Sequence, residues 1–310
     1  MTLWDAEVLA RAQRLRLIAR QAVSGLDYGA HLSRRFGDSV EFIDYKPYVA
    51  GDDVRAIDWR VYARTDRLVL RRHAAERQLP VTLVLDASAD AGTGATTASG
   101  LPDFQDSKLG FGVCLAATVA FYLFQCGEPV GLRIIAGGPL PWDRLPPRRG
   151  QAQLHRILAV LAALRPEGSA DLPDGLRSLA KTSRKRSTTL LISDLMEPVD
   201  GFEAAMRAFG CRIGDLRVAH LYDPKELDLQ IGPAAQLYSP EGGAPIALDP
   251  AAARAVFREI VDDYLAEVRT MVRKARGRYV PAPMDAALGS VMWSVLAGGP
   301  AAHAGKRRFA

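Results

Sequence analysis

Two short runs of strand-forming residues, each followed by an aspartate, constrain the fold of this chain more than any other feature. Residues 81–85 read VTLVL and lead into Asp86, while residues 188–193 read TTLLIS and lead into Asp194. Runs of this length and composition are typical of strands that are covered on both faces. Segments with helical character lie between them, so the pattern predicts a mainly parallel sheet flanked by helices.

Further strands and helices alternate along the same stretch. Strands are expected at 130–135 and 216–221, and helices at 108–126, 151–164, 174–183 and 201–209. The segment 91–105, rich in Gly, Thr and Ser, is predicted to be a loop, and the segment 137–150 is predicted to be irregular because it contains four prolines. The alternation predicts an α/β fold, a doubly wound, mainly parallel sheet with helices on both faces.

Additional elements are expected on either side of this core. An amphipathic helix is predicted at 4–23, a short hairpin at 236–238 and 245–248, and a long helix from Asp249 and Pro250 to a stop at Gly277. The predicted division is 1–79 for the N-terminal helix and a following segment packed on the core, 80–235 for the core, 236–298 for the C-terminal hairpin and helices, and 299–310 for a disordered tail.

Composition narrows the classes of function. The chain has 310 residues, 48% of them hydrophobic, and a formal net charge of only +5, so a nucleic-acid partner is not predicted. Three cysteines without a C-x-x-C pair fit a reducing cytoplasm. The apolar run 109–124 is shorter than the roughly 20 residues that cross a membrane, and residues 1–20 lack the pattern of a signal peptide. We therefore predict a cytoplasmic protein without a membrane span.

The aspartates at the strand ends form the first candidate site. Ligands of an open parallel sheet bind outside the carboxyl ends of its strands. Asp86, Ser88 and Asp90 are spaced at i, i+2 and i+4, so their side chains point the same way in extended backbone. Together with Asp194, these oxygen ligands predict a site for Mg²⁺ or Mn²⁺. The alternative is that Asp86 and Asp194 only cap neighbouring helices and bind loop amides.

The stretch from Glu41 to Glu76 mixes acidic, basic and aromatic residues so closely that fixed ion pairs are expected. Within it, Asp52 or Asp53 is predicted to cap a short helix that runs through Trp59, and a strand is predicted at 68–73. The order of particular residues along this part of the chain resembles the sequence signature of the bacterial family catalogued as domain of unknown function fifty-eight. The resemblance is carried by what we call the signature residues: His31, Glu41, Tyr48, Gly51, Asp52, Asp53, Arg55, Asp58, Trp59, Arg64 and Glu76.

The resemblance implies a von Willebrand factor A-like domain and a MoxR-type AAA+ ATPase as partner. Domains of that kind carry a metal-ion-dependent adhesion site with the motif D-x-S-x-S and a distant Thr and Asp. On this resemblance Asp86, Ser88 and Asp194 carry over, whereas Asp90 stands where the motif has its second serine. The Gly-Thr expected near residue 174 is missing, and Ser169 and Asp171 are the candidates to replace it.

The favoured hypothesis is a non-enzymatic, protein-binding adaptor that works with the ATPase in protein assembly or maturation. It would recognise an unknown protein client through the crevice at Asp86 and Asp194. The alternative is a metal-dependent hydrolase that uses the same acids, with Asp90 or Asp171 as the base. The acidic signature residues form either a structural ion-pair network or a partner-binding face. The five histidines lack metal-ligand spacing and are predicted to be structural or surface residues.

Overall fold

The chain divides into two compact units. The computed structural model describes residues 5–27, 42–49, 52, 54, 57–73, 80–88, 94–96, 102–136, 144–166, 171–182, 187–196, 199–227, 236–237, 246–247 and 250–297. The core unit comprises Met1–Tyr28 and Leu79–Ala310, and the signature unit comprises Gly29–Gln78. The N-terminal helix falls in the core unit, and the predicted division at residues 79, 235 and 298 stays a prediction. The predicted disordered tail, 299–310, lies outside the described residues.

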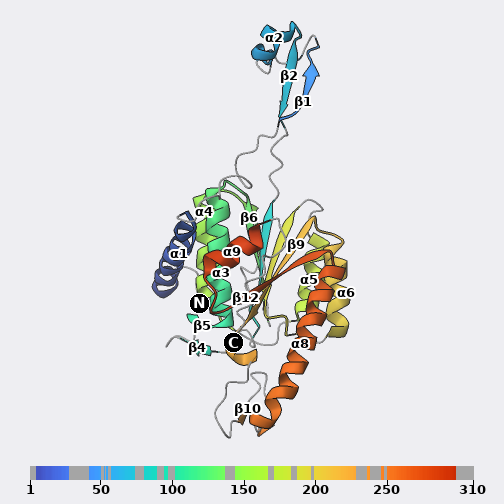
Figure 1. Ribbon diagram of the computed structural model, residues 1–310. Coiled ribbons are helices and arrows are strands. Elements are labelled where there is room, and N and C mark those ends of the chain that lie inside the picture. Colours follow the sequence, from blue (N-terminus) through green and yellow to red (C-terminus); the bar gives the residue numbers. More distant parts are fainter. Residues whose placement is uncertain are drawn as a thin grey trace, which may run out of the picture. The chain divides into compact units, whose positions relative to one another are not determined.

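A six-stranded sheet organises the core unit (Figure 1). Its strand order is β12-β9-β8-β3-β6-β7. Every neighbouring pair is parallel except β6 with the edge strand β7. The sheet confirms the predicted α/β, doubly wound fold, and its strands are β3 (Val81–Asp86), β6 (Val130–Ile135), β7 (Arg144–Arg148), β8 (Thr188–Ser193), β9 (Asp215–Tyr222) and β12 (Gly277–Pro283).

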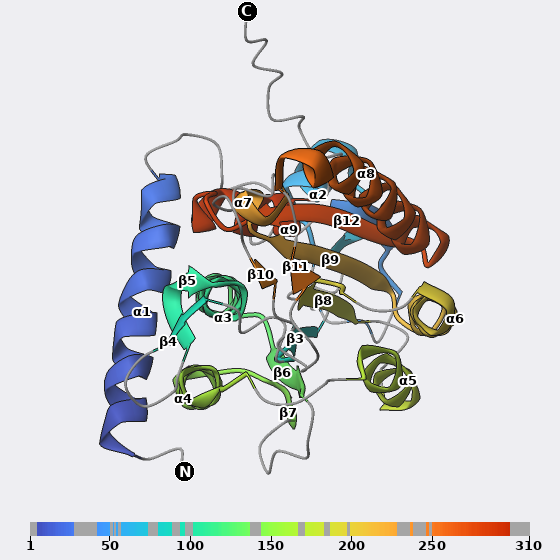
Figure 2. The same cartoon turned by 90° about the horizontal axis from the view of Figure 1, so that it is seen from below.

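Helices cover both faces of this sheet (Figure 2). On one side lie α3 (Lys108–Gln125) and α4 (Gln151–Ala163), with α1 (Ala6–Asp27) packed outside them and α9 (Leu288–Leu296) against α3. On the other side lie α5 (Leu172–Thr182), α6 (Val199–Gly210) and α8 (Pro250–Lys274). The short α7 (Pro224–Leu227) follows the carboxyl end of β9.

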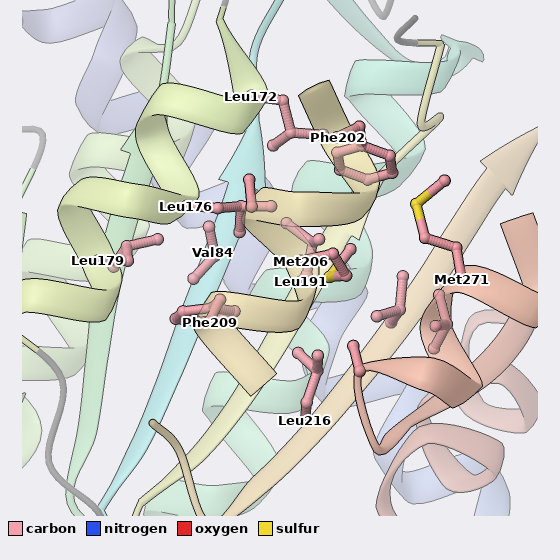
Figure 3. Close-up of a cluster of buried hydrophobic side chains, with 14 of the residues drawn as sticks. Val84, Leu172, Leu176, Leu179, Leu191, Phe202, Met206, Phe209, Leu216 and Met271 are labelled. Atoms are coloured by element: carbon pink, nitrogen blue, oxygen red, sulfur yellow. The ribbon is translucent and has the colours of Figure 1, made fainter. Parts of the chain in front are cut away.

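The spacing of apolar residues explains how the second helix layer binds the sheet. Phe202, Met206 and Phe209 recur at i, i+4 and i+7 and so share one face of α6. They are buried together with Leu176 of α5 and Met271 of α8 over the sheet (Figure 3). This continuous cluster fixes α5, α6 and the C-terminal half of α8 on the same face.

Helix α3 is buried on nearly all sides. Gly112 lets it approach the sheet closely, because a Cβ atom there would lie only 2.8 Å from Leu221 Cδ1. Among the residues that the structure describes, α3 is the one helix that is long and apolar enough to be compatible with a membrane span, and most of it is buried inside the core unit.

Both edge strands of the sheet differ from the sequence prediction. Pro146 and Pro147 lie within β7, where the sequence predicted irregular structure, and Pro281 and Pro283 lie within β12, which was not predicted. Proline cannot donate a ladder hydrogen bond, so it is tolerated on the outer side of an edge strand. The prolines therefore mark the two edges of this sheet.

Three smaller elements also correct or extend the prediction. The segment predicted as a loop at 91–105 contains part of an antiparallel hairpin, β4 (Gly94–Thr96) with β5 (Pro102–Ser107). No range was predicted for α9, although its apolar residues Leu288, Val291, Met292, Val295 and Leu296 recur at i, i+3, i+4, i+7 and i+8. The predicted C-terminal hairpin is present as β10 (Gln236–Leu237) and β11 (Ile246–Ala247).

In its described residues, the signature unit contains an antiparallel strand pair and a short helix. β1 (Phe42–Pro47), which was not predicted, pairs with β2 (Val69–His73). The helix α2 (Trp59–Thr65) begins at Trp59 and is capped by Asp58, whereas the sequence predicted a cap at Asp52 or Asp53 for a helix that runs through Trp59. Asp52 accepts a hydrogen bond from the Val49 amide at 3.1 Å, and Asp53 lies outside the described residues.

Removing the Asp58 cap should loosen α2. Its carboxylate accepts hydrogen bonds from the amides of Arg60 at 3.0 Å and Val61 at 3.4 Å. We expect Asp58→Ala to destabilise the helix by about 1 kcal/mol, seen as faster amide exchange in residues 60–65 with unchanged exchange in the core sheet. Asp58→Asn should keep the protection, because asparagine caps helices equally well. Equal exchange in both variants would show that the cap does not hold α2.

Candidate functional site

Asp86 and Asp194 lie at the carboxyl ends of two adjacent strands. Asp86 is the last residue of β3, and Asp194 follows the last residue of β8, which pairs with β3 in parallel. From β3 the chain proceeds outward to β6 and β7, then returns to β8 on the other side. The two aspartates therefore mark the point where the strand order reverses, which is where sheets of this kind bind ligands.

Ser193 links the two strand ends. Its hydroxyl donates to Asp86 Oδ2 at 2.7 Å and accepts from the Leu195 amide at 2.9 Å. The other oxygen of Asp86, Oδ1, accepts from the Ser88 amide at 3.0 Å. Burial, together with the nearby negative charge of Asp194, raises the pKa of Asp86 from 3.8 to about 6. Both oxygens of this buried carboxyl group are thus engaged within the protein.

Lys108 brings a positive charge into the same place. Its ammonium nitrogen lies 3.2 Å from Asp194 Oδ2 and 3.2 Å from Glu226 Oε2. Lys108 is the first residue of α3, where the helix dipole disfavours a cation, and its side chain is only 9% exposed. Burial opposes its protonation, but the charges of Asp194 and Glu226 outweigh burial, so the pKa of Lys108 is raised and the ammonium stays charged.

His220 supports the loop that carries Asp194. Its Nε2 lies 3.0 Å from the backbone oxygen of Asp194, and its Nδ1 lies 2.8 Å from the hydroxyl of Tyr279. Burial lowers the pKa of His220 from 6.5 to about 4, so the ring is neutral near pH 7. A carbonyl oxygen can only accept, so Nε2 carries the proton and Nδ1 accepts from Tyr279. His220 therefore has a structural role, in line with its prediction.

A cavity of ≈ 410 Å³ opens beside these charged groups. Its polar part consists of Lys108, Asp194, His220 and Glu226. Its apolar lining comes largely from the middle of α8, through Phe257, Ile260, Val261, Tyr264 and Leu265. These positions recur at i, i+3, i+4, i+7 and i+8, which places them on one helix face. Tyr264 donates a hydrogen bond to the backbone oxygen of Leu195 and so ties α8 to the site.

Apolar side chains at the mouth of the cavity are exposed. Ile260 is 60% exposed, and Met196, which follows the strand end, is 62% exposed. Farther along α8, Val268 and Val272 continue the same stripe but are buried in the core. The apolar face of α8 therefore runs beyond the part of the protein that covers it, which is typical of a binding surface.

Comparison with known proteins identifies the family. Residues 44–268 match the family described as "Protein of unknown function DUF58". The chain belongs to this family. It is similar to "Uncharacterized protein Rv1480" of Mycobacterium tuberculosis, with 29% identity over 253 residues that cover 80% of this chain and 76% of that protein. "Uncharacterized protein Mb1516" of Mycobacterium bovis is 29% identical over the same length.

Solved structures are similar to this DUF58 chain at lower identity. Conserved hypothetical protein BatB from Bacteroides thetaiotaomicron has a TM-score of 0.43 and 15% identity, and the match covers 66% of this chain and 90% of that one. A von Willebrand factor type A protein from Catenulispora acidiphila has a TM-score of 0.35 and 15% identity, with coverage of 62% and 42%. The SpRpn10 VWA domain has a TM-score of 0.39 and 11% identity, with coverage of 69% and 93%.

The structure brings together part of the predicted site of this DUF58 protein. Asp86, Ser88 and Asp194 lie at the same strand ends, with Ser88 bound to Asp86 through its amide. Asp171 caps α5, where its carboxylate accepts a hydrogen bond from the Asp174 amide at 2.7 Å. Asp90 and Ser169 lie outside the described residues.

The described side chains do not by themselves fit a hard divalent cation. Such an ion takes about six oxygen ligands, and among the residues that the structure describes no three His, Cys, Asp or Glu side chains are placed to hold one. Asp86 already accepts two hydrogen bonds, and Asp194 Oδ2 faces an ammonium group. The Mg²⁺ or Mn²⁺ site stays a prediction that the geometry of these residues does not support.

The signature residues of the DUF58 pattern are only partly described. Tyr48, Asp52, Asp58, Trp59 and Arg64 have described positions, whereas His31, Glu41, Gly51, Asp53, Arg55 and Glu76 lie outside them. Trp59 is 60% exposed and stacks edge-to-face against Tyr62 with ring centroids 6.1 Å apart. Whether the acidic signature residues form a structural ion-pair network or a partner-binding face stays a prediction.

Sequence reasoning missed Lys108, Glu226 and the pocket wall of α8. One signal for Lys108 was present, because it is the single charged residue in an otherwise apolar and polar-uncharged helix sequence. A lone charge at the start of a buried helix indicates a buried partner. Glu226 carries no comparable signal, since it lies on a four-residue helix beyond the last core strand that the sequence predicted.

Proposed function

We propose that this DUF58 protein is a non-enzymatic, protein-binding adaptor that recognises a protein client at the carboxyl edge of its sheet and works with a MoxR-type AAA+ ATPase. The client-binding role is supported above all by the apolar stripe of α8. This stripe continues past the core and lines the cavity beside Asp194. Exposed Ile260 and Met196 at its mouth offer a surface for an apolar segment of a partner.

The polar part of the cavity gives this surface selectivity. Glu226 pairs with Lys108 yet its side chain remains 49% exposed, so a carboxylate is presented to a bound segment beside the apolar wall. A client segment with an apolar anchor flanked by a basic residue complements both features. The ATPase partner is supported by the family resemblance, and the exposed aromatic pair Trp59 and Tyr62 on the signature unit offers a second surface to hold it.

Photo-cross-linking tests the proposed client surface. We expect a photoreactive phenylalanine analogue at position 260, in the protein expressed in its native host, to cross-link to a discrete protein client. The matched control is the same analogue at Leu17, which is 59% exposed on α1 and outside the cavity. Cross-linking that is absent at position 260, or equal at the two positions, would contradict the proposed surface.

Co-purification tests the ATPase partnership separately. We expect the full chain to elute from a sizing column together with a purified MoxR-type ATPase from the same host, in the presence of ATP. Trp59→Ser should weaken this complex, whereas Leu17→Ser should not, because both side chains are exposed but only the first belongs to the signature unit. Separate elution at micromolar concentrations would remove the ATPase from the proposal.

A further inference from the structure

Asp194, one of the two carboxylates at the strand ends, already pairs with a cation, the ammonium of Lys108. Asp194 is buried, with its side chain 3% exposed, and an isolated carboxylate in that position would be strongly disfavoured. The nearest compensating charge is the ammonium of Lys108 at 3.2 Å from Oδ2. Lys108 reaches this position from the first turn of α3, a place where neither burial nor the helix dipole favours a positive charge. The carboxylates of Asp194 and Glu226 stabilise the Lys108 ammonium in this position.

We propose that the Lys108 ammonium permanently takes the place of a divalent metal ion at this site, so that the protein folds and presents its crevice without a metal. A divalent ion bound to Asp194 Oδ2 would share that oxygen with the ammonium and be repelled by it. Each oxygen of Asp86 already accepts one hydrogen bond, from the Ser88 amide or the Ser193 hydroxyl, so a metal ion there would have to share these oxygens with the contacts that tie the two strand ends. Glu226 contacts the same ammonium, which neutralises part of its charge.

The ammonium group at this site differs chemically from a bound metal ion. An ammonium group donates three hydrogen bonds and carries a single charge, whereas a divalent ion would accept an oxygen ligand from a binding partner. A partner at this crevice is therefore recognised by hydrogen bonds and apolar contact, and chelators leave recognition unchanged. This inference concerns the charge of the site and holds whether or not the proposed client is correct.

Metal titration into the full chain tests the proposal. After treatment with EDTA, we expect wild-type protein to show no saturable binding of Mg²⁺ or Mn²⁺ by calorimetry and no shift of its melting temperature at about 5 mM of either ion. Lys108→Ala removes the ammonium and leaves the carboxylates, so Mn²⁺ should bind at least about 10-fold more tightly than to wild type and raise the melting temperature. Lys274→Ala, which changes an exposed lysine, should behave as wild type.

A charge-conserving variant separates the cation from the fold. Lys108→Arg keeps a positive charge beside Asp194 and should remain unresponsive to Mn²⁺. If Lys108→Ala is too unstable to purify alone, refolding it with and without Mn²⁺ gives the same comparison, and metal-dependent recovery supports the proposal. Saturable binding of Mg²⁺ or Mn²⁺ to wild type below about 1 mM, or an equal response of the alanine and arginine variants, overturns it.

Discussion

Lys108→Met is expected to lower the free energy of unfolding by about 3–5 kcal/mol, because removing one partner of a buried ion pair leaves the other charge uncompensated. Asp194 is 3% exposed and cannot turn to solvent, whereas Glu226, at 49% exposed, can. Methionine has a similar length, so little packing is lost. Urea unfolding followed by circular dichroism measures the difference.

The matched control for this change is Lys274→Met. Lys274 pairs with Glu203 at 3.0 Å, with side chains 53% and 32% exposed. Partly exposed pairs contribute little, so this variant should lose less than about 1 kcal/mol. Equal losses in the two methionine variants would mean that Lys108 is not held in a dry environment.

Asp86→Asn is expected to stabilise the protein, although it changes a residue of the site. In buffer with EDTA at about pH 8, we expect a gain of about 2–3 kcal/mol, which follows from a folded-state pKa near 6 against 3.8 in the unfolded chain. Asparagine keeps the local contacts, since its oxygen can accept from the Ser88 amide and its NH₂ group can donate to Ser193 Oγ. The same urea titration measures the gain.

The gain should depend on pH with a definite sign. Above pH 6, Asp86 is ionised in both states and its burial penalises folding, whereas near pH 3.8 the folded protein holds it neutral at no such cost. His220 acts in the opposite direction, because its folded-state pKa of about 4 lies below 6.5 and its contribution is lost as pH falls between these values. The two effects oppose each other in wild type. The histidine effect is common to wild type and Asp86→Asn and cancels in their difference, so the advantage of the variant should vanish towards pH 4, where folded wild type holds Asp86 neutral.

An exposed aspartate provides the control for this second prediction. Asp174 pairs with Arg177 on the surface of α5, with side chains 72% and 49% exposed. Asp174→Asn should change stability by less than about 0.5 kcal/mol at either pH. If Asp86→Asn were neutral or destabilising at pH 8, the carboxyl group would not be under the strain that its burial implies.

The sequence predicted the central strands of the fold because their signal is local. Strands β3, β6 and β8 are short runs made mostly of apolar and β-branched residues, and an interior strand needs little else to be recognised. The edge strands β7 and β12 were missed because proline is typical of loops. Only the pairing with β6 and β9 shows that each is an edge strand, where proline is tolerated. In the signature unit, Asp52, Asp53 and Asp58 are chemically equivalent caps, and the sequence alone does not select Asp58.

The site was half predictable for a related reason. Asp86 and Asp194 each end a recognisable strand, and parallel pairing brings such ends to one edge. Lys108 lies beside Asp194, and Glu226 lies beside Lys108, because of how α3 and α7 are placed in the fold. No spacing in the chain indicates these contacts. This difference changes the predicted chemistry of the site. Carboxylates alone predict a metal ion, whereas carboxylates around a buried ammonium group predict a site whose negative charge is already partly neutralised.

A double-mutant cycle between Lys108 and Asp194 tests this account most directly. The free energy of unfolding is measured for wild type, Lys108→Met, Asp194→Asn and the double variant, with Lys274 and Glu203 as the reference pair. We predict a coupling energy of at least about 2 kcal/mol for Lys108 with Asp194 and less than about 1 kcal/mol for the reference pair. A coupling energy near zero for Lys108 and Asp194 would contradict the claim that this ammonium is the resident cation of the site.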